Sequence, residues 1–205
     1  MSLFVRLHPP YNRKELQELN SELACYGIKK YYFDFNRQYD YNSLPWLQLL
    51  TYDRKIIYRL KTIAIELEYN PSWTPNDESL FVDQPIFMDL VKEIFGQKES
   101  HFIWNNGYSN SFIPVDFTGG KLTKGCLNTL GSSINLAREL KELAAKLNFD
   151  LEQYTPKYGE DYHLYCDDNF YDVANNILVD EKSILLELYT IALASIENNL
   201  IMSIG

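Results

Sequence analysis

The sequence predicts an α+β fold: a helix-rich single domain over residues 1–205, with five or six helices and a small, mostly antiparallel sheet. Three observations indicate this fold. Leucine and isoleucine recur at helical spacing in several segments of the chain. Strand-like alternation is confined to the start and the middle of the chain. No internal repeat, low-complexity tract or long linker divides the 205 residues.

The first 35 residues are expected to form a strand, a helix and a second strand. Residues 3–8 (LFVRLH) alternate as a strand does. Asn12 and Glu15 form a capping-box pattern at the start of a helix, and Gly27 suits its end. Residues 28–35 (IKKYYFDF) read as a strand dense in aromatic side chains. The order is that of a β-α-β unit, and an antiparallel arrangement stays open because the crossover is short.

A longer helix is expected from about Ser43 to residue 68. Pro45 suits its first turn, and an apolar stripe continues to Leu67. Asp53 stands where this stripe needs an apolar residue. We therefore expect the helix to break at residues 51–52, with Asp53 capping a second piece, in preference to an acid that points into the core.

Three further helices are expected in the rest of the chain. They cover residues 83–96, the segment from Ser132 or Ser133 to Leu147, and residues 180–198. The last helix has an apolar stripe wide enough to be buried on more than one side. The tail that follows, NNLIMSIG, is apolar for a chain end, which predicts docking within the same domain or against a second copy.

Residues 101–117 (HFIWNNGYSNSFIPVDF) predict a β-hairpin, because NNG tolerates the positive φ of a tight reversal between two strand-like runs. A functional interpretation stays open beside this one. The aromatic and amide side chains would then ring a pocket for a sugar, a nucleobase or a peptide. These are Trp104, Asn105, Asn106, Tyr108 and Asn110, with Asp116 alongside. Asp53 would add charge to the pocket, and His101 would carry a proton near neutral pH.

No cofactor or metal is expected. The glycine-rich residues 118–125 lack the order of a P-loop. His163 and Cys166 stand near two aspartates, but no second pair of ligands completes a zinc site. Three separate cysteines without a CxxC pair are typical of reduced thiols. No G-x-S-x-G or H-E-x-x-H motif occurs, so whether the protein is an enzyme stays open.

Charge and composition decide the expected partners. The chain has a net charge of −9 and 16 tyrosines. Such acidity disfavours nucleic acid and anionic membranes as partners. No signal peptide or span of about 18 apolar residues occurs, as is typical of a bacterial cytoplasmic protein.

Three functions are compatible with this composition. The first is a protein-interaction module with a basic partner, for example in a toxin-neutralising or immunity-type role. The second is a small-molecule binder or enzyme that uses the cleft around residues 101–116. The third is a homodimer that is completed by the C-terminal helix and tail.

Overall fold

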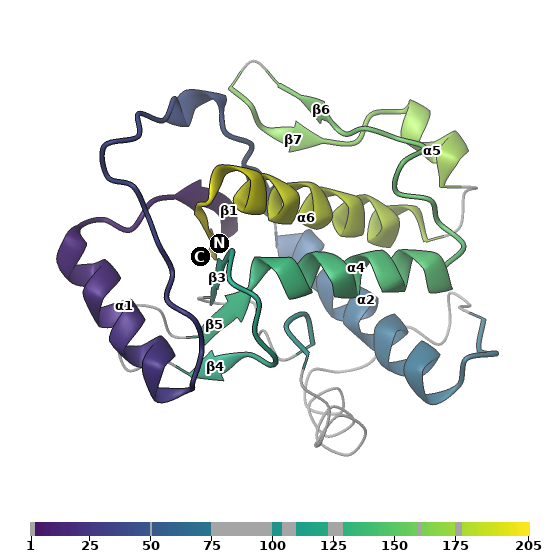
Figure 1. The fold of residues 1–205 in the computed structure, drawn as a ribbon. Coiled ribbons are helices and arrows are strands. Elements are labelled where there is room, and N and C mark those ends of the chain that lie inside the picture. Colours follow the sequence, from purple (N-terminus) through teal and green to yellow (C-terminus); the bar gives the residue numbers. More distant parts are fainter. Residues whose placement is uncertain are drawn as a thin grey trace.

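A computed structural model describes residues 3–49, 51–74, 100–103, 110–122, 129–159, 161–174 and 178–205. A mixed sheet with helices on both faces organises these residues (Figure 1). No helix among them has the length and apolar character needed to cross a membrane. That residues 1–205 form one domain stays a prediction.

Six strands form the main sheet, in the order β2-β1-β8-β3-β5-β4. The parallel pair is β3–β5, and the other four pairings are antiparallel. The strand β8 lies between β1 and β3, so it joins the two halves of the sheet. The strands are β1 (Leu3–His8), β2 (Leu47–Leu49), β3 (Asn110–Ile113), β4 (Lys121–Leu122), β5 (Thr129–Ser132) and β8 (Ile201–Ile204).

Four helices of 13 to 20 residues pack against this sheet: α1 (Arg13–Cys25), α2 (Thr51–Tyr69), α4 (Ser133–Lys146) and α6 (Val179–Asn198). Local signals explain two of their starts. The Asn12 side chain accepts a hydrogen bond from the backbone N–H of Glu15, at 2.9 Å. Ser132 accepts one from Asn135 N–H in the same way, at 3.2 Å. Both expected caps are thereby confirmed.

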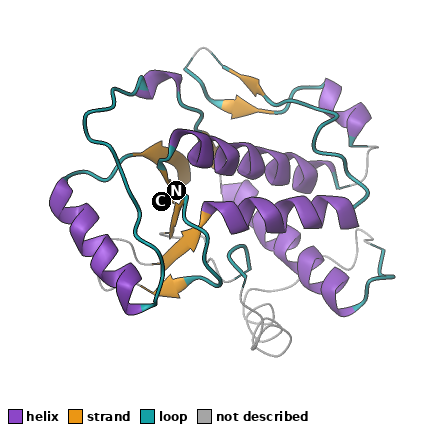
Figure 2. Cartoon of the chain, viewed as in Figure 1, coloured by secondary structure: helices purple, strands orange, loops and turns teal. Residues whose placement is uncertain are grey.

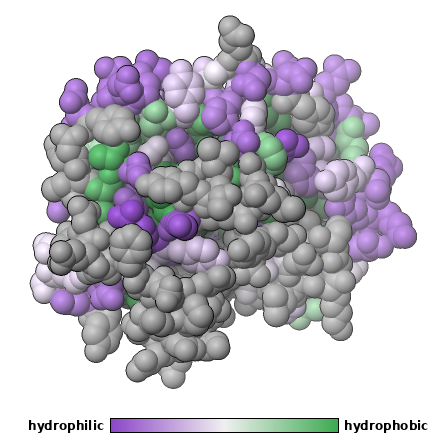
Figure 3. Space-filling view, turned by 180° about the vertical axis from the view of Figure 1, so that it is seen from behind, coloured by the Kyte–Doolittle hydropathy of each residue, from purple (hydrophilic) through white to green (hydrophobic). Residues whose placement is uncertain are grey.

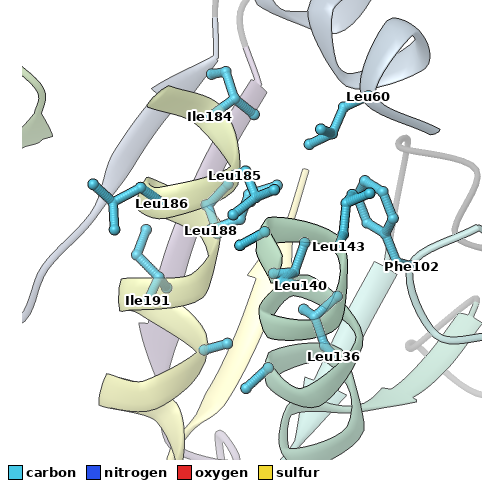
Figure 4. Close-up of a cluster of buried hydrophobic side chains, with 14 of the residues drawn as sticks. Leu60, Phe102, Leu136, Leu140, Leu143, Ile184, Leu185, Leu186, Leu188 and Ile191 are labelled. Atoms are coloured by element: carbon cyan, nitrogen blue, oxygen red, sulfur yellow. The ribbon is translucent and has the colours of Figure 1, made fainter. Parts of the chain in front are cut away.

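The core lies on both faces of the sheet because neighbouring residues of a strand point to opposite sides. Phe112 and Met202 belong to the cluster under α2, α4 and α6, whereas Ile113 and Ile201 pack under α1. Figure 4 shows leucines of α4 and α6 directed toward one another, with Leu186 on the side of α6 away from α4. The wide stripe predicted for this helix is therefore buried on more than one side.

The expected fold class is wrong in two respects. The described residues contain four helices of 13 to 20 residues in place of five or six; α5 (Asn169–Val173) adds only a short helix of five residues. The sheet is larger than expected and mixed: it has six strands, β3–β5 is a parallel pair, and the other four pairings are antiparallel as expected. The helix expected at residues 83–96 lies outside the described residues.

Three local expectations are also wrong. Residues 28–35 form no strand: the Tyr31 side chain is buried, and its hydroxyl donates to the carbonyl of Asn199 at 2.8 Å. Residues 47–49, expected to be helical, form β2, and α2 begins only at Thr51. Residues 101–103 form a turn, and β3 pairs with β5 and β8, so no hairpin joins the two halves of residues 101–117.

Candidate functional site

Most of the net charge of the protein comes from one segment. Residues 150–172, here called the acidic segment, contain seven acidic residues and one lysine, which makes a net charge of −6 out of −9. Its acidic residues are Asp150, Glu152, Glu160, Asp161, Asp167, Asp168 and Asp172. Nineteen lysines and arginines are spread over the chain, so their scarcity here is a local property.

The acidic segment is attached to the fold by a few apolar side chains. It contains the two-stranded ladder β6 (Lys157–Tyr158) and β7 (Leu164–Tyr165), followed by α5, and it lies over α6 (Figures 1 and 2). Leu164 and Phe170 are buried in the main core. A bridge between Trp46 and His163 places β7 beside the start of β2. Five of the described acidic side chains of the segment remain exposed.

Three aspartates of the segment are held in place by the backbone. Each accepts a hydrogen bond from the N–H two residues later, in an Asx-turn: Asp150 from Glu152 at 2.9 Å, Asp161 from His163 at 3.2 Å, and Asp167 from Asn169 at 3.2 Å. The bond restricts the side chain, which is short to begin with. The position of the carboxylate is therefore set by the chain and not by a flexible stem.

Asp167 is the most heavily bonded of these carboxylates. It accepts hydrogen bonds from Lys157, from the Tyr154 hydroxyl at 2.6 Å and from the Asn169 amide at 3.0 Å. The bonds from Lys157 and then Tyr154 lower the pKa of Asp167 to about 2. Burial and the bond to Asp167 in turn raise the pKa of Tyr154 to about 12. The Asp167 carboxylate is therefore ionised at physiological pH.

Five acidic side chains of the segment are exposed, and within the described part of the chain none of them forms a salt bridge. They are Asp150, Glu152, Asp161, Asp168 and Asp172. Some acidic residues elsewhere are paired, such as Asp116 with Arg138 at 3.0 Å and Glu68 with Lys146 at 2.7 Å, whereas Asp34 and Glu142 are exposed like those of the segment. Figure 3 shows hydrophilic residues along the upper rim, where the acidic segment lies in Figure 1. This rim offers negative charge to a partner.

The cleft predicted from the sequence is only partly within the described residues. Trp104, Asn105, Asn106 and Tyr108 lie outside them. Asp53 is in the first turn of α2, and its side chain is not described.

The other three residues of the predicted cleft have defined surroundings. Asn110 is buried at the start of β3, and its side-chain amide has no hydrogen-bond partner among the residues that the structure describes. Asp116 is exposed and binds Arg138 and Asn135. His101 is buried. Its Nδ1 accepts a hydrogen bond from the backbone N–H of Ser132, and its Nε2 donates one to the carbonyl of Phe117. Both ring nitrogens are therefore engaged in hydrogen bonds within the fold. As a ligand site, the set stays a prediction.

None of the candidate sites predicted from the sequence includes the acidic segment. The signal that could have found it is the ratio of seven acids to one lysine. Its closely spaced histidine, cysteine and aspartates also raised the question of metal. Among the described residues, no group of three or more His, Cys, Asp or Glu side chains could hold a metal ion.

A comparison with protein families identifies the relatives of the chain. The model of the family described as "Putative DNA-mimic protein" matches residues 8–204. The chain belongs to this family. It matches no curated protein and no solved structure. The family match includes every helix of the described residues and the whole acidic segment.

Membership of the DNA-mimic family corrects the expected functions. The family is described by its likeness to DNA, and this description contradicts two predicted functions. They are the toxin-neutralising or immunity-type module and the small-molecule binder or enzyme around residues 101–116. The expected partners are corrected in part: a basic protein partner fits a DNA-mimic family, whereas a homo-oligomer through the C-terminal helix and tail does not fit the structure. The tail forms β8, which is paired on both sides by β1 and β3, and α6 is buried on more than one side.

Proposed function

We propose that this protein binds a DNA-binding protein on the surface with which that partner holds DNA, and thereby competes with DNA for it. The observation that carries the proposal is the set of exposed carboxylates on the acidic segment of a member of the DNA-mimic family. The cytoplasmic location expected from the sequence is part of this proposal, since the partner must be met where it binds DNA.

The physical basis is the substitution of carboxylates for phosphates. A DNA-binding surface collects lysine and arginine because duplex DNA carries one negative charge per roughly 1.7 Å of its axis. Exposed aspartates and glutamates offer the same sign of charge to those cations, and they steer the encounter in the same way. The Asx-turns at Asp150, Asp161 and Asp167 reduce the entropy that is lost when the carboxylates become fixed against a partner.

Competition with DNA provides the test. Proteins of the native cell are first bound to duplex DNA on a column and eluted with salt, and this fraction is then passed over the immobilised full chain. We expect one or more proteins to be retained and then released by added duplex DNA. In a gel-shift assay, the purified protein should displace DNA from the retained partner. Retention of nothing, or a partner that binds DNA and this protein together, would contradict the proposal.

A pair of charge-matched variants assigns the binding to the acidic segment. Replacing Asp150, Asp161 and Asp168 by asparagine removes three charges but keeps a side-chain oxygen for the Asx-turns at positions 150 and 161. We expect the affinity for the retained partner to fall at least about fivefold. The control carries Glu18→Gln, Glu22→Gln and Asp34→Asn, the same charge change on and after α1. An equal loss in both variants would show that net charge alone acts.

A further inference from the structure

A hollow of about 420 Å³ lies at the C-terminal end of α4. It is lined by Ala144, Phe149, Leu151 and Tyr189, here called its apolar floor, and by the exposed acidic residues Asp150 and Glu152, here called its rim. The hollow is thus at the beginning of the acidic segment, and its last wall comes from α6. Phe149 also packs edge-to-face against Phe170 of α5, with ring centres 5.8 Å apart, which ties the floor to the core.

The end of α4 adds a partial negative charge beside this hollow. The last turn is closed by backbone bonds, from Asn148 N–H to Ala145 O at 3.1 Å and from Phe149 N–H to Ala144 O at 2.9 Å. A helix carries a partial negative charge at this end. Asn148 has a left-handed φ of 50°, which turns the chain so that Asp150 follows directly beside the helix end. The carboxylate of Asp150 is then fixed by its Asx-turn.

We infer that this hollow receives one arginine side chain of the DNA-binding partner, with its stem on the apolar floor and its guanidinium at Asp150 and Glu152. The inference rests on the proposed function. An arginine suits the hollow better than a lysine because its guanidinium is more weakly hydrated, pairs with carboxylates and stacks on rings such as that of Tyr189. The same molecule already places Arg6 4.5 Å from the centre of the Phe4 ring and Arg37 4.7 Å from that of Tyr39.

The hollow adds selectivity that carboxylates alone do not have. Exposed carboxylates attract any DNA-binding surface, and salt screens that attraction. An apolar floor rewards only a partner whose arginine has the right position, and DNA phosphates offer no equivalent of it. Binding at the hollow is therefore the part of the contact that selects one partner among many DNA-binding proteins.

Lys141 gives the inference a further consequence. This exposed lysine also lines the hollow, so its ammonium competes with an incoming guanidinium for the carboxylates at the rim. Replacing it with glutamine removes the competing charge and keeps a good helix former. Lys141→Gln is therefore expected to strengthen arginine binding, in contrast to a substitution that fills the hollow.

An NMR titration of the full chain tests the inference with octaarginine as the probe and octalysine, which has the same charge, as its control. We expect backbone shifts at residues 144–152 that are larger with octaarginine. Ala145→Leu, which fills the hollow without a change of charge, should weaken octaarginine binding roughly fivefold. Ala24→Leu, at an exposed alanine of α1, should leave it unchanged. Equal shifts with both peptides, or an Ala145→Leu variant that binds like the wild type, would overturn the inference.

The retained partner of the DNA-competition experiment separates this inference from the proposed function. A captured partner that binds Ala145→Leu as tightly as the wild type overturns the inference and leaves the proposed function intact. Capture of no partner overturns the proposed function, whatever the peptides do. A partner whose affinity falls with Ala145→Leu and rises with Lys141→Gln supports both.

Discussion

Gly131 has no room for a side chain. A Cβ atom at this position of β5 would lie 2.4 Å from Cδ1 and 2.6 Å from Cε1 of Phe112. The Phe112 ring is buried in the main core, so it cannot withdraw without disturbing its neighbours. The close approach of β3 and β5 at this register therefore requires glycine.

We predict that Gly131→Ala lowers the free energy of unfolding by about 2 kcal/mol, because the new methyl group forces the Phe112 ring from its place. Urea unfolding of the purified variant measures the loss. Gly120→Ala is the matched control, since its nearest side-chain neighbour would be 3.8 Å away. Equal stability of the two variants would show that the ring can move freely.

Lys61 links the stability of the protein to pH. Burial lowers the pKa of this α2 lysine from 10.5 to about 7. The folded chain therefore releases the proton near pH 7, whereas the unfolded chain keeps it up to about pH 10.5. Since the unfolded state binds more protons in this window, the free energy of unfolding rises with pH, by at most about 1.4 kcal/mol per unit.

We predict that Lys61→Met removes this slope, and that it stabilises the protein more at pH 6 than at pH 9. Urea unfolding between pH 6 and 9 measures both effects. The upper limit avoids Cys166, whose pKa is raised by burial from 9.0 to about 12, because that thiol has the opposite effect above pH 9. A slope that is the same in wild type and variant would assign the pH dependence to other groups.

At the scale of elements, one carboxylate of α4 shapes the turn before β3. Glu139 accepts hydrogen bonds from the Ser100 hydroxyl at 2.6 Å and from the backbone N–H groups of His101 and Phe102 at 2.8 and 2.9 Å. These donors converge on a single side chain, which holds residues 100–103 as a turn. This turn places the Phe102 side chain in the main core.

We predict that Glu139→Gln lowers the free energy of unfolding by about 2 kcal/mol. The glutamine amide has only one acceptor oxygen, and its NH₂ group would face one or more of the groups that donate to the Glu139 carboxylate. Hydrogen exchange should also become faster at His101 and Phe102. Glu142→Gln, an exposed change on the same helix, should stay within about 0.5 kcal/mol of the wild type. Protected amides at residues 101–102 in the Glu139 variant would contradict this role.

Elements with local signals could be predicted from the sequence, and those that depend on distant partners could not. The starts of α1 and α4 follow from Asn12 and Ser132, which act within three residues. Residues 28–35 have a strand-like pattern, but Tyr31 is held by Asn20 and Asn199 instead of a neighbouring strand. Residues 101–103 are likewise set by Glu139, which lies 38 residues after His101. Periodicity contains no information about such contacts.

The same limit applies to the candidate site. The charge density of residues 150–172 is visible in the sequence, and so is the scarcity of lysine there. The hollow beside α4 is not visible in the sequence, because Tyr189 of α6 lines it together with the distant Leu151. Nor did composition indicate a DNA-mimic protein; the family match gave that description.

At the scale of the whole molecule, binding to the partner should depend on salt. We predict that the affinity for the retained DNA-binding protein falls as salt rises from 50 to 200 mM, because each contact between a carboxylate and a cation is screened. The affinity of the variant with asparagine at Asp150, Asp161 and Asp168 should fall less steeply with salt than that of the wild type. The slope of the control variant, changed at Glu18, Glu22 and Asp34, should stay closer to that of the wild type. Fluorescence anisotropy of the labelled partner measures both slopes. Identical slopes in all three proteins would place the contact outside the acidic segment.

The central place of β8 has a consequence for how the chain is made. His8 pairs with Ile201, so β1 stays unpaired on this side until a segment 193 residues later has been synthesised. Contacts so distant in sequence slow folding and leave the nascent sheet with unpaired edges. We therefore expect ribosome-bound chains that stop before residue 200 to be cleaved by protease around β1 and β3. In chains that extend past β8, both strands should become protected from protease at the same chain length.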